Sequence, residues 1–172
     1  MDRRDRAGDD VAVQIPTFQT LSKDLGATAL RRGLNLWPPF LAASVNVDRI
    51  SPDFREFDVS LRMRPWSRNY VGTQFGGSLF AMCDPWWMLG ALRNLGGDYI
   101  VWDKAGEIDF VSPGRTDVST SIRLTDELLD GIRAATADGS KHLVWCDNDV
   151  VAADGTLVAR YRKQLYVRRK RA

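Results

Sequence analysis

Apolar residues recur with two different periods along the chain, and the changes of period predict the order of the elements. Residues 17–37 carry leucines and a tryptophan at helical spacing, which predicts an amphipathic helix that ends at Pro38-Pro39. Residues 42–50 and 54–64 alternate between apolar and polar positions, which predicts two strands. A short turn joins them, so we expect an antiparallel pair.

The second half of the chain shows the same two periods. A loop over residues 65–74 precedes an apolar run from Gly76 to Leu95, which predicts one long buried helix ended by Gly96-Gly97. The elements predicted after it are strands over 99–111 and 116–124, a helix over 125–139, and strands over 142–153 and 156–170.

Alternation along the later strands assigns their faces. In the last strand, one face is predicted to be buried and carries Leu157, Ala159, Tyr161, Leu165 and Val167; the other carries Val158, Arg160, Arg162 and Gln164. In the strand over 99–111, Asp103, Glu107 and Asp109 are all at odd positions, so we expect the three carboxylates to share the solvent-facing side.

The order helix, two strands, buried helix, two strands, helix, two strands predicts an α+β fold. We expect a six-stranded antiparallel sheet around one apolar helix, with an additional N-terminal helix. Residues 1–14 are charged and nearly devoid of large apolar side chains, which predicts a flexible arm, and residues 15–172 are predicted to form a single domain.

Composition excludes several classes of protein. With 172 residues, 44% hydrophobic and 27% charged, the chain is typical of a globular protein. Asp84 and Pro85 interrupt the longest apolar run, so no membrane span is predicted. The N-terminus has no apolar segment of the signal-peptide kind, and we expect a cytoplasmic protein. Cys83 and Cys146 lack metal-site spacing and are predicted to be free, buried thiols.

Charge and histidine content narrow the chemistry further. The net charge is only +2, and the basic residues at 168–172 have no recognition motif beside them, so we expect a solvated tail and no nucleic-acid partner. The sequence has one histidine, His142, at the start of a predicted strand. A histidine-rich metal site is therefore excluded, and no metal or cofactor is predicted.

Asp84 is the one charge in the apolar run of the long predicted helix, and two interpretations remain open. Because Asp84 precedes Pro85, it could cap a second helix that starts there. It also lies seven residues after Gly77, about two turns along the same helical face, where a carboxylate could act as a base or nucleophile.

The segment "NYVGTQFGGSLFAMCD" resembles the hotdog-fold thioesterases of the phenylacetate-degradation type. The positions that match that family's motif are Asn69, Gly72, Thr73, Gly76, Gly77, Phe80 and Asp84, and "GEIDFVSPGR" (106–115) resembles the strand and turn that follow. Phe75 stands where the family has histidine. The resemblance covers about residues 40–170 and is greatest to an uncharacterised branch that keeps Phe-Gly-Gly and Asp-Pro.

The resemblance implies an acyl-CoA thioesterase whose site lies at the interface of a homodimer, with a homotetramer also possible. Asp84 would be the base or nucleophile, the Gly77 amide the oxyanion donor, and Asn69 would position water or the thioester carbonyl. Free N–H groups at a helix N-terminus suit an oxyanion. Thr73, Phe75 and Gly76 would line the substrate site, whereas Gly76 and Gly77 could instead serve tight packing, and Asn69 could instead cap the loop.

Trp86 and Trp87 have two possible roles, an acyl or aryl pocket or the core. A second functional hypothesis is a non-catalytic hotdog protein that binds an acyl or apolar ligand, which the replacement at Phe75 motivates. A hotdog dehydratase is a third, more distant hypothesis, because that chemistry pairs a histidine with a carboxylate and His142 is remote in sequence from the motif.

Overall fold

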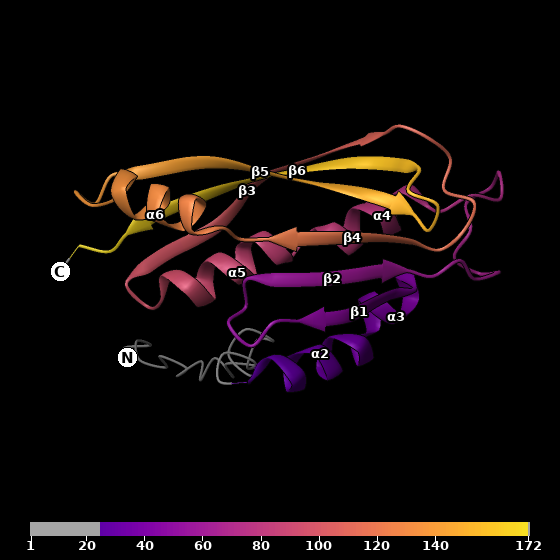
Figure 1. Cartoon of the computed structure of the whole chain (residues 1–172), viewed down its shortest axis with the longest axis horizontal. Helices are drawn as coiled ribbons and strands as arrows, with labels where there is room; N and C mark the ends of the chain where they lie inside the picture. Colours follow the sequence, from indigo (N-terminus) through magenta and orange to yellow (C-terminus); the bar gives the residue numbers. More distant parts are fainter. Residues whose placement is uncertain (1–24, 172) are drawn as a thin grey trace, which may run out of the picture.

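The helices and strands follow one another in nearly the predicted order. The computed structural model describes residues 25–171, so the predicted arm over 1–14 and the start of the predicted helix over 17–37 lie outside the described residues. The helices are α2 (Ala27–Leu36), α3 (Pro38–Ala43), α4 (Gly76–Cys83), α5 (Trp86–Leu95) and α6 (Asp126–Ala135); the strands are β1 (Val45–Ile50), β2 (Glu56–Leu61), β3 (Tyr99–Phe110), β4 (Val118–Arg123), β5 (Lys141–Ala152) and β6 (Leu157–Arg169) (Figure 1).

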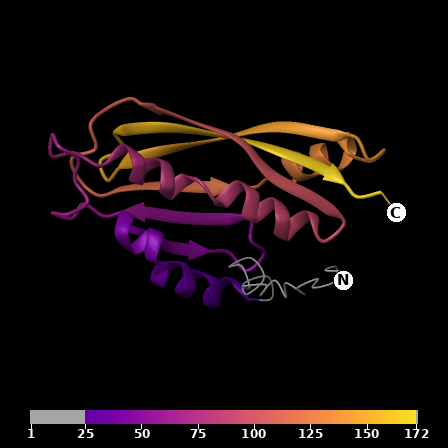
Figure 2. The same ribbon diagram turned by 180° about the vertical axis from the view of Figure 1, so that it is seen from behind.

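The described strands form one six-stranded sheet in the order β1-β2-β4-β5-β6-β3, with every neighbouring pair antiparallel. β5 and β6 are long and pair along most of their length. The helices α4 and α5 lie along one face of this sheet (Figure 2). The predicted α+β architecture, a sheet around a central helix with an N-terminal helix beside it, is thereby confirmed.

The central helix is interrupted at the Asp84-Pro85 pair. The sequence predicts one helix over 76–95, but α4 ends at Cys83 and α5 begins at Trp86. Proline has no N–H to donate and its ring crowds the preceding turn, so a continuous helical ladder cannot pass through Pro85. Both residues keep right-handed helical backbone angles, and α5 therefore continues along the sheet after the interruption.

The core lies between this helical layer and the sheet. Trp86 at the start of α5 is fully buried, and its ring packs against Phe40 of α3 and Phe57 of β2 at centroid distances of 6.0 and 5.3 Å. Burying one such aromatic side chain contributes roughly 1.5–3 kcal/mol. A side chain at Gly90 would collide with Leu124, so glycine lets the second turn of α5 approach the sheet closely.

The N-terminal helices cover the β1 edge of the sheet. Asn35 of α2 donates to the Val47 carbonyl at 3.0 Å and accepts from the Val47 amide at 2.7 Å, so its side chain takes the place of a neighbouring strand. The prediction that Pro38-Pro39 simply ends this helix is incomplete. Pro38 also begins α3, because proline is favoured in a first helical turn.

A β-bulge in β3 changes which side chains face the helices. The pairing of β3 with β6 shifts between Asp103 and Ala105. Before the bulge the odd-numbered residues face the helical layer, and after it the even-numbered residues do, since each extra residue reverses the alternation. Asp103 therefore faces inward, whereas Glu107 lies on the outer side near Arg162. The prediction that these carboxylates share one face is wrong for Asp103.

Candidate functional site

Asp84 lies between α4 and α5, and side chains of β6 bind its carboxylate. Its Oδ1 accepts a hydrogen bond of 2.6 Å from the Lys163 ammonium and one of 3.4 Å from the Tyr161 hydroxyl. The Asp84 side chain is 44% exposed. Asp84 is thus held on one side and open to solvent on the other.

Lys163 is the buried centre of this cluster, with only 3% of its side chain exposed. On its far side the ammonium contacts Asp103 of β3 at 3.0 Å. Burial raises the pKa of Asp103, and the hydrogen bond and charge of Lys163 oppose that rise. Burial also raises the pKa of Tyr161, so the hydroxyl keeps its proton and acts as a donor to Asp84.

The start of α5 tests one of the two interpretations of Asp84, the helix cap. The N-cap residue of α5 is Pro85, and no side chain makes a capping hydrogen bond there, so the helix-cap interpretation is wrong. Asp84 is the one charge in its apolar run, but its carboxylate is not alone in the fold, because it forms an ion pair with Lys163.

The N-terminus of α4 presents two glycines. Phe75 is the N-cap residue and makes no side-chain cap, and within residues 25–171 no acceptor bonds the amides of Gly76 or Gly77. A Cβ at Gly77 would lie 2.5 Å from the Phe75 ring, and one at Gly76 would lie 2.9 Å from the Phe110 ring. The glycines therefore serve close packing of two rings and leave free N–H groups at a helix start.

Asn69 organises the loop that leads into α4. Its Oδ1 accepts from the amides of Val71 and Thr73, and its Nδ2 donates to the Thr73 hydroxyl and the Gln74 carbonyl. Its side chain thus performs the loop-capping role that was one of the two predicted alternatives. Because these four bonds fix the loop, Asn69 also holds Thr73 beside the N-terminus of α4.

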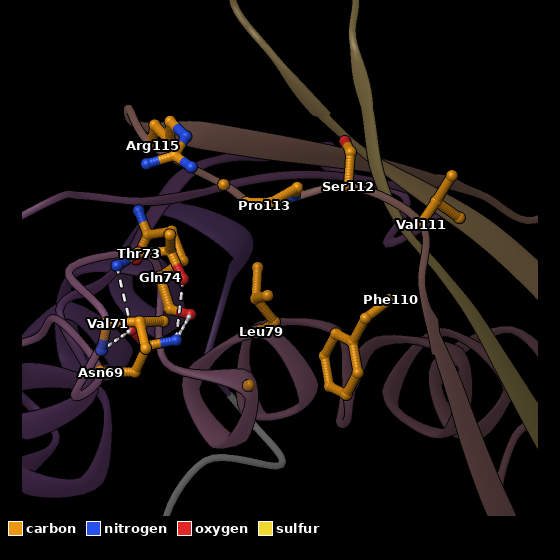
Figure 3. Close-up of a pocket in the computed structure, with 12 residues that line it drawn as sticks. Asn69, Val71, Thr73, Gln74, Leu79, Phe110, Val111, Ser112, Pro113 and Arg115 are labelled. Atoms are coloured by element: carbon orange, nitrogen blue, oxygen red, sulfur yellow. Dashed lines mark hydrogen bonds between the residues drawn. The ribbon is translucent and has the colours of Figure 1, made fainter.

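A cleft of about 520 Å³ opens between this loop and the turn after β3. Figure 3 shows Asn69, Val71, Thr73 and Gln74 on one side, the segment 110–115 on the other, and Leu79 of α4 between them. Gln74 is buried, with its Nε2 bonded to the carbonyls of Leu61 and Thr116, whereas its Oε1 has no hydrogen-bond partner. The cleft therefore unites Asn69, Thr73 and Gly76 of the predicted site, whereas Asp84 is not among its lining residues.

The comparisons with known proteins place the chain in a family. The family model described as "Domain of unknown function (DUF4442)" matches residues 26–167. The chain belongs to this family. No curated protein sequence matches it.

Solved structures share the fold of this DUF4442 member at low sequence identity. A Pseudomonas aeruginosa protein, PA5026, described as a probable thioesterase, superimposes with a TM-score of 0.70 at 16% identity, covering 83% of this chain and 95% of that one. The thioesterase HI1161 of Haemophilus influenzae superimposes with a TM-score of 0.60 at 12% identity, covering 84% of this chain and 92% of that one. A mutant of the phenylacetic acid degradation protein PaaI of Thermus thermophilus superimposes with a TM-score of 0.52 at 18% identity, covering 76% of this chain and 98% of that one. Their common architecture is the predicted hotdog fold.

The two tryptophans and the two cysteines neither line the cleft nor hydrogen-bond to the Asp84 carboxylate. The structure places both tryptophans in the core rather than at a pocket wall: the Trp86 indole donates to the Met82 carbonyl and the Trp87 indole to Asn148. Cys83 and Cys146 are free and buried, as predicted, and burial raises the pKa of each thiol to about 12. Neither thiol is therefore suited to act as a nucleophile.

The single histidine, His142, lies in β5 of this DUF4442 member. His142 pairs with Val167 in β6, four residues along that strand from Lys163, and is not among the residues that contact Asp84. Between residues 25 and 171, no group of three or more histidine, cysteine or acidic side chains is placed to hold a metal ion. Across the same range, no helix is long and apolar enough to cross a membrane.

Lys163 is the residue that sequence reasoning missed. It stands at an odd position of β6, in the same series as Tyr161 and Leu165, so the alternation itself places its side chain on the buried face. A lysine in such a series is almost never buried without a partner. The signal was therefore present in the sequence, but the partner carboxylates could not be identified before the sheet register was known.

Proposed function

We propose that this protein hydrolyses a thioester, with an acyl-CoA as the substrate class, Asp84 as the base or nucleophile and the Gly77 amide as the oxyanion donor. The observation that carries the proposal is the half-exposed Asp84 carboxylate held by the buried Lys163 ammonium. A carboxylate that a buried cation holds in place and that solvent still reaches can take a proton from a bound water molecule.

In the base-catalysed version, Asp84 takes a proton from water while the water oxygen bonds to the thioester carbonyl carbon. Negative charge develops on the carbonyl oxygen, where the Gly77 N–H would stabilise it. The carbon–sulfur bond then breaks, the carboxylic acid is released, and the leaving thiolate takes the proton back from Asp84. No cofactor or metal takes part in these steps.

Two copies of the chain would complete the site. Asp84 follows Gly77 by seven residues, about 10 Å along a helix axis, so one chain does not bring its carboxylate to its own oxyanion donor. Exposed apolar side chains lie in the cleft wall and in the segment that leads into α4: Val71, Phe110 and Val111 line the cleft, and Trp66, Tyr70 and Phe75 belong to residues 65–75. An exposed apolar patch of this kind favours a protein interface. We propose a homodimer in which Asp84 of one copy faces the Gly77 amide of the other.

The site residues divide the work between binding and chemistry. The cleft lined by Thr73 and Gly76 would receive part of the substrate next to the oxyanion donor, and Asn69 would keep that wall in place. Phe75 lies where a histidine is expected from the thioesterase resemblance, and its ring occupies the space that a Cβ on Gly77 would need. An apolar ring thus replaces a polar side chain next to the proposed oxyanion donor. This favours the second candidate function, a hotdog protein that binds an acyl ligand without hydrolysing it.

A panel of acyl-CoA substrates tests the proposal directly. We expect turnover of at least one thioester by the wild type and a loss of about 100-fold or more in kcat for Asp84→Asn. Asp149→Asn, which removes an exposed carboxylate on the outer side of β5, is the matched control and should keep wild-type activity. Equal background rates for wild type and Asp84→Asn on every thioester would reject hydrolysis, and ligand-induced thermal stabilisation without turnover would support the binding function.

Mixed dimers test whether the site is shared. Asp84→Asn is expected to be inactive as a homodimer because it lacks the base. Gly77→Ala is expected to be inactive because its Cβ would lie 2.5 Å from the Phe75 ring, and the resulting shift would displace the Gly77 amide. When both variants are refolded together, half of the dimers are mixed and each mixed dimer regains one intact site, so about a quarter of wild-type activity should return. No recovery from a mixture shown to contain mixed dimers would mean that each copy carries its own complete site.

A further inference from the structure

Lys163 occupies a position in the sheet that an apolar residue would normally fill. Its neighbours on the inward face of β6 are Tyr161 and Leu165, both fully buried. Across the sheet it pairs with Gly106 of β3 and the buried Cys146 of β5. Replacing a buried ion pair with well-packed apolar residues is often neutral or stabilising. The lysine at this position is therefore not explained by stability alone.

The contacts of Lys163 point to Asp84 as the group through which it acts. Its ammonium lies between the carboxylates of Asp84 and Asp103 at 2.6 and 3.0 Å, and it is too deeply buried to reach a bound ligand. Both hydrogen bonds received by Asp84 go to Oδ1, from Lys163 and Tyr161. In the described part of the chain no donor contacts Oδ2, so that oxygen is available to a water molecule.

We propose that Lys163 is a positioning residue that holds Asp84 Oδ1 and thereby aims Oδ2 at the attacking water, with Asp103 anchoring the ammonium from behind. This inference rests on the proposed thioesterase function. Lys163 exchanges no proton in the reaction: Oδ2 takes the proton from water and returns it to the leaving thiolate. Fixed orientation of this kind affects the rate of the chemical step more than substrate binding.

The test compares two neighbouring cations of β6. Lys163→Met should lower kcat by about 10- to 100-fold and leave KM within about twofold, because a misplaced base slows the chemistry without changing the cleft. Arg162→Met removes the adjacent cation on the outer side of the sheet and should leave both constants unchanged. Lys163→Arg, which keeps the charge, should retain more activity than Lys163→Met.

A kinetic cycle separates positioning from a merely structural role. In the Asp84→Asn background, Lys163→Met should cause no further loss of kcat, because the group it acts through is already gone. If Lys163→Met does not fold, Lys163→Met/Asp103→Asn replaces it, since that variant leaves no charge unpaired against Asp103. The inference would be overturned, with the proposed function left standing, by either of two results. One is wild-type kcat in folded Lys163→Met; the other is that Lys163→Met lowers kcat by the same factor in the wild-type and Asp84→Asn backgrounds. A wild-type protein inactive on every thioester would overturn the proposed function and this inference with it.

Discussion

Lys163 and Arg162 are consecutive residues of β6, and each is a cation that contacts two carboxylates. Lys163 is 3% exposed and lies between Asp84 and Asp103, whereas Arg162 is 49% exposed and contacts Asp147 at 2.8 Å and Glu107 at 3.8 Å. Similar charges are thus arranged on the two faces of one strand. They differ in access to water, and that difference decides what each cluster contributes.

On the outer face, solvent already stabilises every member of the cluster. The Arg162 guanidinium lies 4.8 Å from the centre of the Trp145 ring, so it also makes a cation–π contact. Exposed ion pairs contribute about 0–1 kcal/mol. On the inner face, the ammonium has lost its water and depends on Asp84 and Asp103 for compensation. The inner cluster is therefore fixed in geometry, whereas the outer cluster is replaceable.

The largest expected difference between the clusters is in stability. Lys163→Met should lower the free energy of unfolding by about 3–5 kcal/mol, because it leaves the half-buried Asp103 without its partner. Arg162→Met should change it by about 1 kcal/mol or less. Denaturant unfolding of both variants measures the difference. Similar losses in the two variants would show that burial does not distinguish the clusters.

A second expected effect comes from removing the inner charges together. Asp84→Asn, Asp103→Asn and Lys163→Met combined should be more stable than Lys163→Met alone by at least about 1 kcal/mol, because no charge is then left unpaired. The combined variant should nevertheless lack thioesterase activity. Its unfolding curve and its rate on the best substrate are measured side by side. A triple variant as unstable as Lys163→Met would mean that packing, not charge, causes the loss.

A smaller effect is expected in the pH dependence of stability. Because burial raises the pKa of Asp103, the unfolded chain releases that proton at a lower pH than the folded protein does. The Asp103 contribution to stability therefore falls as pH rises above the ordinary aspartate value of about 3.9. Asp103→Asn should lack this fall, and Asp147→Asn should keep it. Unfolding free energies measured across the acidic range test the sign, and identical slopes in Asp103→Asn and wild type would refute it.

The smallest expected effect concerns salt. Between 0.1 and 1 M NaCl the screening length falls from about 10 to 3 Å, which weakens exposed ion pairs and affects buried ones much less. The stability difference between wild type and Arg162→Met should therefore vanish at high salt, while that for Lys163→Met should persist. Denaturation by urea at both salt concentrations is the measurement. Equal salt sensitivity of the two differences would place the Lys163 ammonium in contact with solvent.

Most of the fold could be predicted from the sequence because its signals are local. Alternation located all six described strands, helical spacing located α2, and the apolar run over 76–95 located α4 and α5 as one predicted helix. The interruption at Pro85 was visible as one of two alternatives for Asp84, but the cap that it suggested does not form, because Asp84 turns toward Lys163 and Tyr161. Local preference for a helix cap was thus overridden by a contact between distant segments.

The candidate site could be predicted only in part. The motif from Asn69 to Asp84 located the cleft wall and the carboxylate, and Thr73 and Gly76 do line the cleft. The tryptophans after Pro85 were assigned two roles, and only the packing of α5 against β2 shows that they belong to the core. An apolar side chain next to a site motif carries no local signal of which way it points.

The order of the elements and the position of one carboxylate, Asp84, within an apolar run follow from the amino-acid sequence alone. Tertiary structure alone decided what that carboxylate contacts. The bulge in β3 turns Asp103 inward, and the pairing of β3 and β6 sets Lys163 beside it. Periodicity is a property of neighbours along the chain, whereas register and bulges arise from pairing between strands far apart in sequence. The Asp84–Lys163–Asp103 cluster therefore exists only once the sheet has formed.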